Sequence, residues 1–244
     1  RAGGRVSLGR QLTPQLSISG ALRLEEVNLS DPDDPAPQLL QDSLGSNFLS
    51  TARFSIAHDT RDRPFLPGEG HYINASYEQA FGNFNYPRAE LEASQYFTVL
   101  SRPDGGGRHI LTLSSQLGWT DVDTPIFERY FAGGFQTFRG FAFRGVGPKD
   151  GNVRVGGRWM AIGTAEYMFP IMANEMVQLV AFTDFGTVED SVGFNDFRLT
   201  VGGGLRITVP AMGPVPLAFD WGIPVIKDPH DDTRLFSFSL RVQR

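Results

Sequence analysis

The chain has 244 residues, a formal net charge of −5 and no cysteine. The acidic balance argues against a nucleic-acid-binding protein, and the lack of cysteine excludes disulfide bonds and cysteine-based zinc sites. A mean hydropathy of −0.19 and the absence of a long apolar run exclude a helical membrane protein.

Eleven strands are predicted from segments in which apolar and polar residues alternate. In chain order they span about 5–12, 16–27, 49–58, 72–81, 89–100, 110–119, 159–169, 177–184, 198–209, 215–225 and 235–242. The alternation is strictest at 215–225, where Phe219 and Trp221 flank Asp220. Each strand therefore has one apolar face and one face that is small, polar or charged. The regular spacing gives no reason to divide the chain, and one domain over 1–244 is expected.

The connections between these strands alternate in length. Short ones are expected at 13–14, 101–107, 171–175 and 210–214, and longer ones at 29–47, 120–154, 188–197 and 226–233. Those at 59–70 and 82–87 fit the alternation by position but not by length. Short turns on one side and long loops on the other are typical of an outer-membrane β-barrel.

A soluble β-sandwich is the alternative, since its strands also alternate. Three features favour the barrel: strands of ten or more residues, aromatic residues near strand ends, and charges deep within the polar faces. These charged residues are Arg53, Glu90, Glu92, Glu166, Asp184 and Arg206.

The segment 59–70 reads Asp-Thr-Arg-Asp-Arg-Pro-Phe-Leu-Pro-Gly-Glu-Gly. Asp59 and Asp62 can accept backbone N–H bonds and pair with Arg61 or the next arginine, while Pro67 and Gly70 help to fix a turn. We interpret this segment as a well-capped turn without a further role.

The segment 128–148 is too long, too aromatic and too rich in glycine for an ordinary connection. Its motif residues are Gly133, Gly134, Phe138, Arg139, Gly140 and Phe141. The glycines allow backbone conformations that are closed to other residues, so the loop can fold back on the barrel wall. A guanidinium carried into a lumen needs an acidic partner, and the following strands offer Glu166 and Asp184.

Enzyme functions find little support, and no catalytic residue is predicted. The chain has no Gly-x-Ser-x-Gly elbow, no histidine pair at metal-binding spacing and no phosphate loop in a strand–helix context. The four histidines are scattered along the chain. The acidic runs at 31–34 and 228–232 lack the spacing of a calcium loop and are expected to be solvated.

Together the motifs resemble those of the BamA superfamily of outer-membrane assembly and translocation barrels. The loop matches a Gly-Gly pair followed by Arg-Gly-Phe, the turn matches Asp-Thr-Arg-Asp with a later Pro-x-x-Gly, and 202–220 is similar to the penultimate hairpin. Phe182, Asp184 and Gly186 match a Phe-x-Asp-x-Gly strand motif. The resemblance implies that Arg139 meets Phe182 and Asp184 inside the barrel, with Glu166 nearby.

The resemblance covers about residue 49 to the end and implies a sixteen-stranded antiparallel transmembrane β-barrel with an inward-folded extracellular loop. Five predicted strands follow the loop and six precede it. The chain is therefore expected to be the C-terminal part of the barrel, with the first five strands and the POTRA repeats outside it. It departs from the family at its C-terminus, which ends in Arg244 rather than in an aromatic residue.

The resemblance also implies a function: folding and inserting other β-barrel proteins into the outer membrane of a Gram-negative-type envelope, without a cofactor or metal. The expected partners are outer-membrane lipids, unfolded β-barrel clients and accessory lipoproteins, with no nucleic acid. Client strands would pair at a lateral seam formed in part by the final strand, with Leu235, Phe236, Phe238 and Leu240. The alternatives are a polypeptide-secretion transporter of the same superfamily, and a passive pore or patatin-linked barrel.

Overall fold

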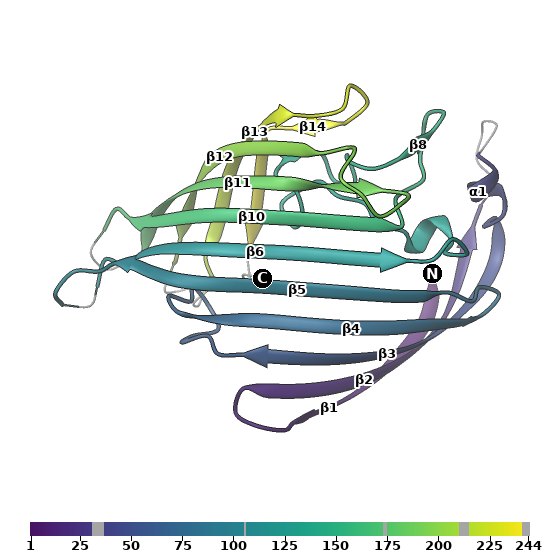
Figure 1. The fold of residues 1–244 in the computed structure, drawn as a ribbon, viewed down its shortest axis with the longest axis horizontal. Coiled ribbons are helices and arrows are strands. Elements are labelled where there is room, and N and C mark those ends of the chain that lie inside the picture. Colours follow the sequence, from purple (N-terminus) through teal and green to yellow (C-terminus); the bar gives the residue numbers. More distant parts are fainter. Residues whose placement is uncertain (31–36, 105, 173–174, 210–214, 241–244) are drawn as a thin grey trace.

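The computed structural model describes residues 1–30, 37–104, 106–172, 175–209 and 215–240. Its main element is one antiparallel 11-stranded sheet in the order β1-β2-β3-β4-β5-β6-β10-β11-β12-β13-β15 (Figure 1). The strands are β1 (Ala2–Gln11), β2 (Leu16–Leu29), β3 (Gly45–Asp59), β4 (Gly70–Gly82), β5 (Pro87–Leu100), β6 (His109–Thr120), β10 (Trp159–Pro170), β11 (Val177–Glu189), β12 (Arg198–Ile207), β13 (Leu217–Ile226) and β15 (Phe236–Leu240). Each strand pairs with its predecessor among these, as expected of a barrel wall.

Short elements lie in the connections. They are α1 (Gln38–Gln41), the 3₁₀ turn η1 (Ile126–Glu128), β7 (Gly140–Phe141), β8 (Lys149–Asp150), β9 (Val153–Arg154) and β14 (Thr233–Arg234). Among the described residues, no helix is long and apolar enough to cross a membrane.

The eleven predicted strands all form, with differences at their ends. The prediction was wrong for the end of β11, which continues past Asp184 to Glu189 because its last residues still pair with β10, opposite Trp159. Several predictions lie wholly or partly outside the described residues. The turn at 210–214 and the acidic run at 31–34 lie wholly outside them. The connections at 29–47, 101–107 and 171–175, the hairpin at 202–220 and the end of the strand at 235–242 lie partly outside them.

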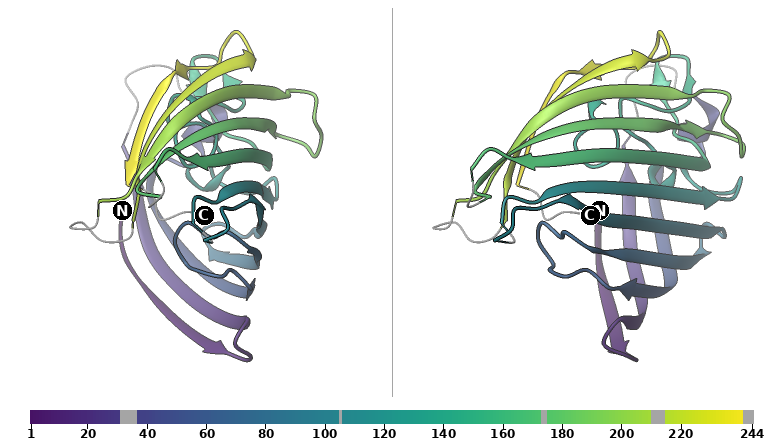
Figure 2. Two further views of the ribbon diagram at one scale, coloured as in Figure 1. Left: turned by 90° about the vertical axis from the view of Figure 1, so that its left-hand side faces the viewer. Right: turned by 60° about the vertical axis from the view of Figure 1, so that its left-hand side comes forward.

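The sheet is strongly curved, and its connections separate into two ends. The short turns β1–β2, β5–β6 and β10–β11 lie at one end, and the long connections β2–β3, β6–β10 and β13–β15 lie at the other (Figures 1 and 2). We call these the turn end and the loop end. The β6–β10 connection folds into the concave side of the sheet, as Figure 2 shows.

The two faces of the sheet have the polarity of a membrane barrel. On β13, Trp221 and Ile223 are 50% and 60% exposed, whereas the neighbouring Asp220 is 2% exposed. The same inversion holds on β11, where Phe185 is exposed and Asp184 is buried. A soluble sandwich buries the apolar face of its strands, so the sandwich alternative is wrong. The fold is an antiparallel transmembrane β-barrel wall of eleven strands.

The concave side contains small hydrophobic clusters built between the wall and its connections. One joins Tyr130, Phe138 and Phe141 of the β6–β10 loop to Ile162 and Val188 of the wall. A second gathers residues of β6, β10 and β11, with one residue of the β3–β4 turn packed against it: Ile110, Met168, Val180, Phe182 and Leu66. The core of this molecule is therefore made by connections folded against the inner face of the sheet.

Candidate functional site

Arg139 lies at the centre of the candidate site, on the loop between β6 and β10. Its guanidinium donates from Nε and Nη2 to the two carboxylate oxygens of Asp184, at 2.8 and 2.7 Å, and from Nη1 to Glu166 at 2.6 Å. Its backbone N–H also donates to Asp184, at 3.0 Å. The arginine is 3% exposed. This bidentate pairing fixes both the position and the orientation of the loop.

The ring of Phe182 lies under the same guanidinium. The Arg139 Cζ atom is 3.4 Å from the ring centroid, a close cation–π contact. Both contacts that the family resemblance implies for Arg139, with Phe182 and Asp184, are present, and Glu166, which was expected nearby, is also paired with it. They arise because Glu166 on β10 and Phe182 on β11 are opposite each other in the strand register.

The inner face of β12 and β13 adds a second arginine to this group. Arg206 donates to Asp220 at 2.7 Å and to Glu166 at 3.2 Å, and Asp220 is also 3.9 Å from Arg139. Two guanidinium groups thus face three buried carboxylates, which come from β10, β11 and β13. We call Arg139, Glu166, Asp184, Arg206 and Asp220 the arginine lock.

The glycines of the loop meet two different physical needs. Gly133, Gly134 and Gly140 have φ angles of +117°, +84° and +88°, which side-chain-bearing residues rarely adopt. A Cβ atom on Gly140 would also lie 3.1 Å from the carbonyl oxygen of Gly222 on β13. Gly140 therefore lets the loop backbone lie directly against the wall.

The motif also contacts the segment that leads into the last strand. Gly140 and Phe141 form β7, which pairs with Arg234 and Thr233 of β14. The adjoining Ala142 N–H donates to the Asp232 carbonyl at 2.8 Å. The loop thus holds the approach to β15 through main-chain hydrogen bonds.

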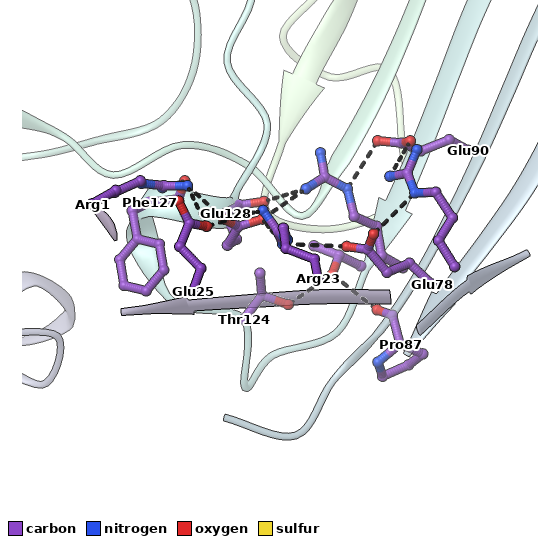
Figure 3. Close-up of polar contacts among 12 residues, drawn as sticks. Arg1, Arg23, Glu25, Glu78, Pro87, Glu90, Thr124, Phe127 and Glu128 are labelled. Atoms are coloured by element: carbon purple, nitrogen blue, oxygen red, sulfur yellow. Dashed lines mark hydrogen bonds and ion pairs between the residues drawn. The ribbon is translucent and has the colours of Figure 1, made fainter. Parts of the chain in front are cut away.

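Sequence reasoning missed a second anchor of the loop, at Glu128. Its carboxylate accepts from Arg1 and Arg23 at 3.1 Å each and from Arg88 at 3.4 Å (Figure 3). Glu128 is 6% exposed. Arg53 extends the cluster through ion pairs with Glu78 and Glu90, at 3.0 and 2.9 Å. We call this set the glutamate anchor.

Apolar contacts support the glutamate anchor. Phe127 packs against the cluster of Leu49, Ala80 and Tyr86 at the loop end of β3 and β4. Tyr130 stacks on Arg88, with 4.5 Å between the guanidinium carbon and the ring centroid, and covers Gly118, where a Cβ would lie 2.6 Å from its ring. In the sequence, only the charged residues on the polar strand faces indicated such a cluster. Identifying Glu128 as its centre requires knowing how β1 to β5 are aligned in the sheet.

The 59–70 segment forms the capped turn that its sequence predicts. Asp59 accepts from Nε and Nη2 of Arg61 at 2.9 and 2.7 Å, and Asp62 accepts from the Gly68 N–H at 2.8 Å. Gly70 has φ +91°, and a Cβ there would lie 2.2 Å from the Thr60 carbonyl oxygen. Pro67, in the same turn, is buried.

Two carboxyl groups at the turn end have shifted pKa values. Burial alone raises the pKa of Asp62, but the N–H groups of Gly68 and Glu69 and the nearby Arg63 together hold it below its ordinary value. Burial likewise raises the pKa of Glu175, and hydrogen bonds from Arg108 outweigh that effect and lower it. Both groups are therefore stabilised in the charged form.

The histidines are less scattered than their sequence positions indicate. His58 and His71 stack with 4.9 Å between ring centroids, and Nδ1 of the first is 2.7 Å from Nε2 of the second. Strands β3 and β4 bring them together near the turn end. Within the described ranges, no group of three or more His, Asp or Glu side chains is arranged to hold a metal ion.

Comparison with known proteins places this geometry in a family. The Omp85 superfamily domain matches residues 1–240. The chain belongs to the Omp85 superfamily. The outer membrane protein assembly factor BamA of Nitratidesulfovibrio vulgaris is 27% identical over 236 residues, and that of Neorickettsia risticii is 24% identical over 216 residues; these alignments cover 92% and 83% of the chain. A SAM50-like protein of Schizosaccharomyces pombe is 25% identical over 150 residues, which cover 58% of the chain and 32% of that protein.

A solved structure has the same fold as this Omp85 chain. The crystal structure of BamA from Haemophilus ducreyi lacking POTRA domains 1–3 matches 97% of the chain with a TM-score of 0.79 and 18% sequence identity. The chain corresponds to 53% of that structure. It spans only 29% of each of the two BamA sequences.

Proposed function

We propose that this chain is the C-terminal barrel portion of a BamA-like factor that folds and inserts β-barrel proteins into the outer membrane of a Gram-negative-type envelope. The observation that carries the proposal is the arginine lock, which pins a long loop inside a wall whose outer face is apolar. The names of the two BamA relatives, outer membrane protein assembly factors, support the same function.

The loop that packs against the inner wall favours assembly over passive permeation. A passive pore needs an open polar lumen, whereas here the loop places Phe138, Arg139 and Phe141 against the inner wall, each 3% exposed or less. The proposal includes no catalytic residue and no cofactor, because strand pairing in a barrel is driven by hydrogen bonding and burial in lipid.

The proposed mechanism uses the last strand as one side of a lateral seam. Among the described residues, β15 is an edge strand of the sheet and pairs with β13 from Phe236 to Leu240. An edge strand offers unpaired N–H and C=O groups that template an incoming strand. The exposed Phe236, Phe238 and Leu240 would face lipid, and Leu235 leads into the strand.

The proposed partners follow from this mechanism. They are outer-membrane lipids around the apolar face, unfolded β-barrel clients at the seam and accessory lipoproteins, with no nucleic acid. A polypeptide-secretion transporter of the same superfamily is the competing function, and its substrate would cross the lumen instead of entering the wall.

The test is reconstitution of the full-length parent protein in lipid vesicles with an unfolded barrel client. Arg139→Ala should reduce client insertion at least tenfold, because it removes the bidentate pairing that positions the loop. Arg158→Ala is the matched control. Arg158, at the end of the same loop, also makes two hydrogen bonds to one aspartate, Asp190, at 3.0 and 3.1 Å, but it is partly exposed.

Insertion by wild type and by the control, with loss in the Arg139 variant, supports the assembly function. Transport of a secreted polypeptide into the vesicles without any client insertion would overturn it in favour of secretion.

A further inference from the structure

The β3–β4 turn, residues 60–69, extends far from its own strands. Its tip residue Leu66 packs against a buried cluster on β6, β10 and β11 that consists of Ile110, Met168, Val180 and Phe182. The turn tip also lines one pocket together with Glu175 and Thr208, next to β11 and β12. The turn therefore lies across the interior at the turn end, within the curve of the sheet (Figure 2).

Leu66 has an unusual backbone conformation for its residue type. Its φ angle is +48°, in the left-handed region that leucine rarely adopts. Such a conformation persists where surrounding contacts determine it. Here the surrounding contacts are the apolar packing of the Leu66 side chain and the hydrogen bonds that Asp62 accepts from Gly68 and Glu69.

Polar contacts fasten this turn to two neighbouring connections. Arg108, in the β5–β6 connection, lies 3.5 Å from Asp62 and donates to Glu175 of the β10–β11 connection at 2.9 Å. Thr98 donates from its hydroxyl to the Gly68 carbonyl at 3.0 Å. The turn is thus held across the interior at several points.

Phe182 belongs both to the cluster that receives Leu66 and to the site of Arg139. Its ring lies 3.4 Å from the Arg139 guanidinium carbon. On β12, Gly202 faces the same ring, and a Cβ atom there would lie 2.4 Å from it. The ring is therefore closely confined by the wall, the cluster and the guanidinium.

We propose that the β3–β4 turn positions Arg139 through Phe182, so that the turn end and the loop end of the barrel are coupled. In this arrangement Leu66 is a positioning residue: it fixes the orientation of the Phe182 ring, against which the Arg139 guanidinium packs. This inference goes beyond the assembly function and does not depend on which polypeptide the barrel handles.

Amide hydrogen exchange on the purified full-length protein tests the coupling. Leu66→Ala should speed exchange at the Phe138 and Arg139 amides about tenfold, because a loosened Phe182 weakens the loop above it. These amides donate to Gly134 and Asp184 in the folded protein. Leu100→Ala is the matched control, since Leu100 ends β5 near the same end of the sheet and is 58% exposed.

A milder variant and a reverse experiment complete the test. Leu66→Met keeps most of the side-chain volume and should leave loop exchange near the wild-type rate. Coupling is reciprocal, so Arg139→Ala should in turn speed exchange at the Gly68 and Glu69 amides, but not at the Leu16 amide of the β1–β2 turn. Unchanged loop exchange in a folded Leu66→Ala protein overturns the proposal, whatever the protein does with barrel clients.

Discussion

At the scale of single residues, the arginine lock gathers charged side chains at buried positions. Burying an ion pair costs desolvation that the attraction between the charges only partly offsets, so such a pair adds little net stability when intact. Removing one partner is different, because it leaves buried charges without compensation. Arg139 forms hydrogen bonds to two buried carboxylates. Its removal should therefore lower the stability of the fold more than removal of an exposed arginine.

Arg139→Ala should therefore lower the free energy of unfolding by about 3–5 kcal/mol, the usual cost of breaking a buried pair. Arg139→Lys should lose less, since it keeps the charge but cannot form the two parallel bonds to Asp184. Denaturant unfolding of the folded barrel in detergent measures both variants. Equal stability of wild type and Arg139→Ala would contradict the lock.

Glu128 is the second residue whose removal should loosen the loop. Glu128→Gln leaves Arg1, Arg23 and Arg88 without a shared carboxylate and should cost about 2 kcal/mol, typical of hydrogen bonds to charged groups. Glu78→Gln is a matched control, because Glu78 is equally buried and pairs with Arg23 and Arg53 but contacts no loop residue in the cluster.

Limited proteolysis separates the two glutamate variants. The Glu128 variant should be cut faster within the β6–β10 loop, while the Glu78 variant should be cut there at the wild-type rate. Equal cutting of both variants would show that the glutamate anchor stabilises the wall and not the loop.

The sequence predicted the contacts between residues that each lie in a recognisable motif. It did not predict contacts that depend only on how the strands are aligned in the sheet. Arg139 and Asp184 are 45 positions apart, but each lies in a recognisable motif. Glu128 lies in no recognisable motif, and its arginine partners on β2, on β5 and just before β1 converge only in the folded sheet. Leu66 was overlooked for a similar reason: nothing local indicates that a turn residue packs on the far side of the interior.

At the scale of elements, the strands were predictable because their period of two is strong and uninterrupted. The predicted strand ended at Asp184, because Gly186 interrupts the alternation of apolar and polar residues. In the structure, the backbone of Gly186 still pairs with β10, opposite Ile162, so β11 continues. The turn between β3 and β4 was predicted as a simple cap. Its internal hydrogen bonds match that prediction, but its reach across the interior depends on tertiary packing.

The turn-end ion pairs predict an acid sensitivity. The folded-state pKa values of Asp62 and Glu175 lie below their ordinary values of 3.8 and 4.5. Their contribution to stability is therefore fully present above those ordinary values and is lost as the pH falls below them, toward the lower folded-state values. Amide exchange at Gly68 and Glu69 should accelerate over that range.

A control variant isolates the source of this acid response. Glu175→Gln should weaken the response, because glutamine cannot titrate and Arg108 then keeps only Asp62 as a charged partner. Acceleration that begins well above pH 4.5 would contradict the assignment to these carboxyl groups.

At the scale of the whole molecule, the apolar outer face and the separation of short turns from long loops set an orientation in the membrane. A barrel of this class has its short turns in the periplasm and its long loops outside the cell. These 244 residues contain no cysteine, so within them a single introduced cysteine is the only thiol that can react.

Val192→Cys, in the β11–β12 loop, should react with a membrane-impermeant maleimide on intact cells. Gln15→Cys, in the β1–β2 turn, should react only after the outer membrane is opened. Val192 is 65% exposed and Gln15 is also exposed, so neither change disturbs the core. Labelling of both positions on intact cells would contradict the proposed orientation.

The two anchors of the inner loop have opposite charges, and this has a consequence for the order of folding. Glu128 requires arginines from β2, from β5 and from the residue just before β1, whereas Arg139 requires carboxylates from β10 and β11. Arg1 is 127 positions from Glu128, so this contact closes a long loop and costs chain entropy. The loop can dock fully only after both halves of the wall exist, so its docking is a late step that marks a correctly ordered sheet.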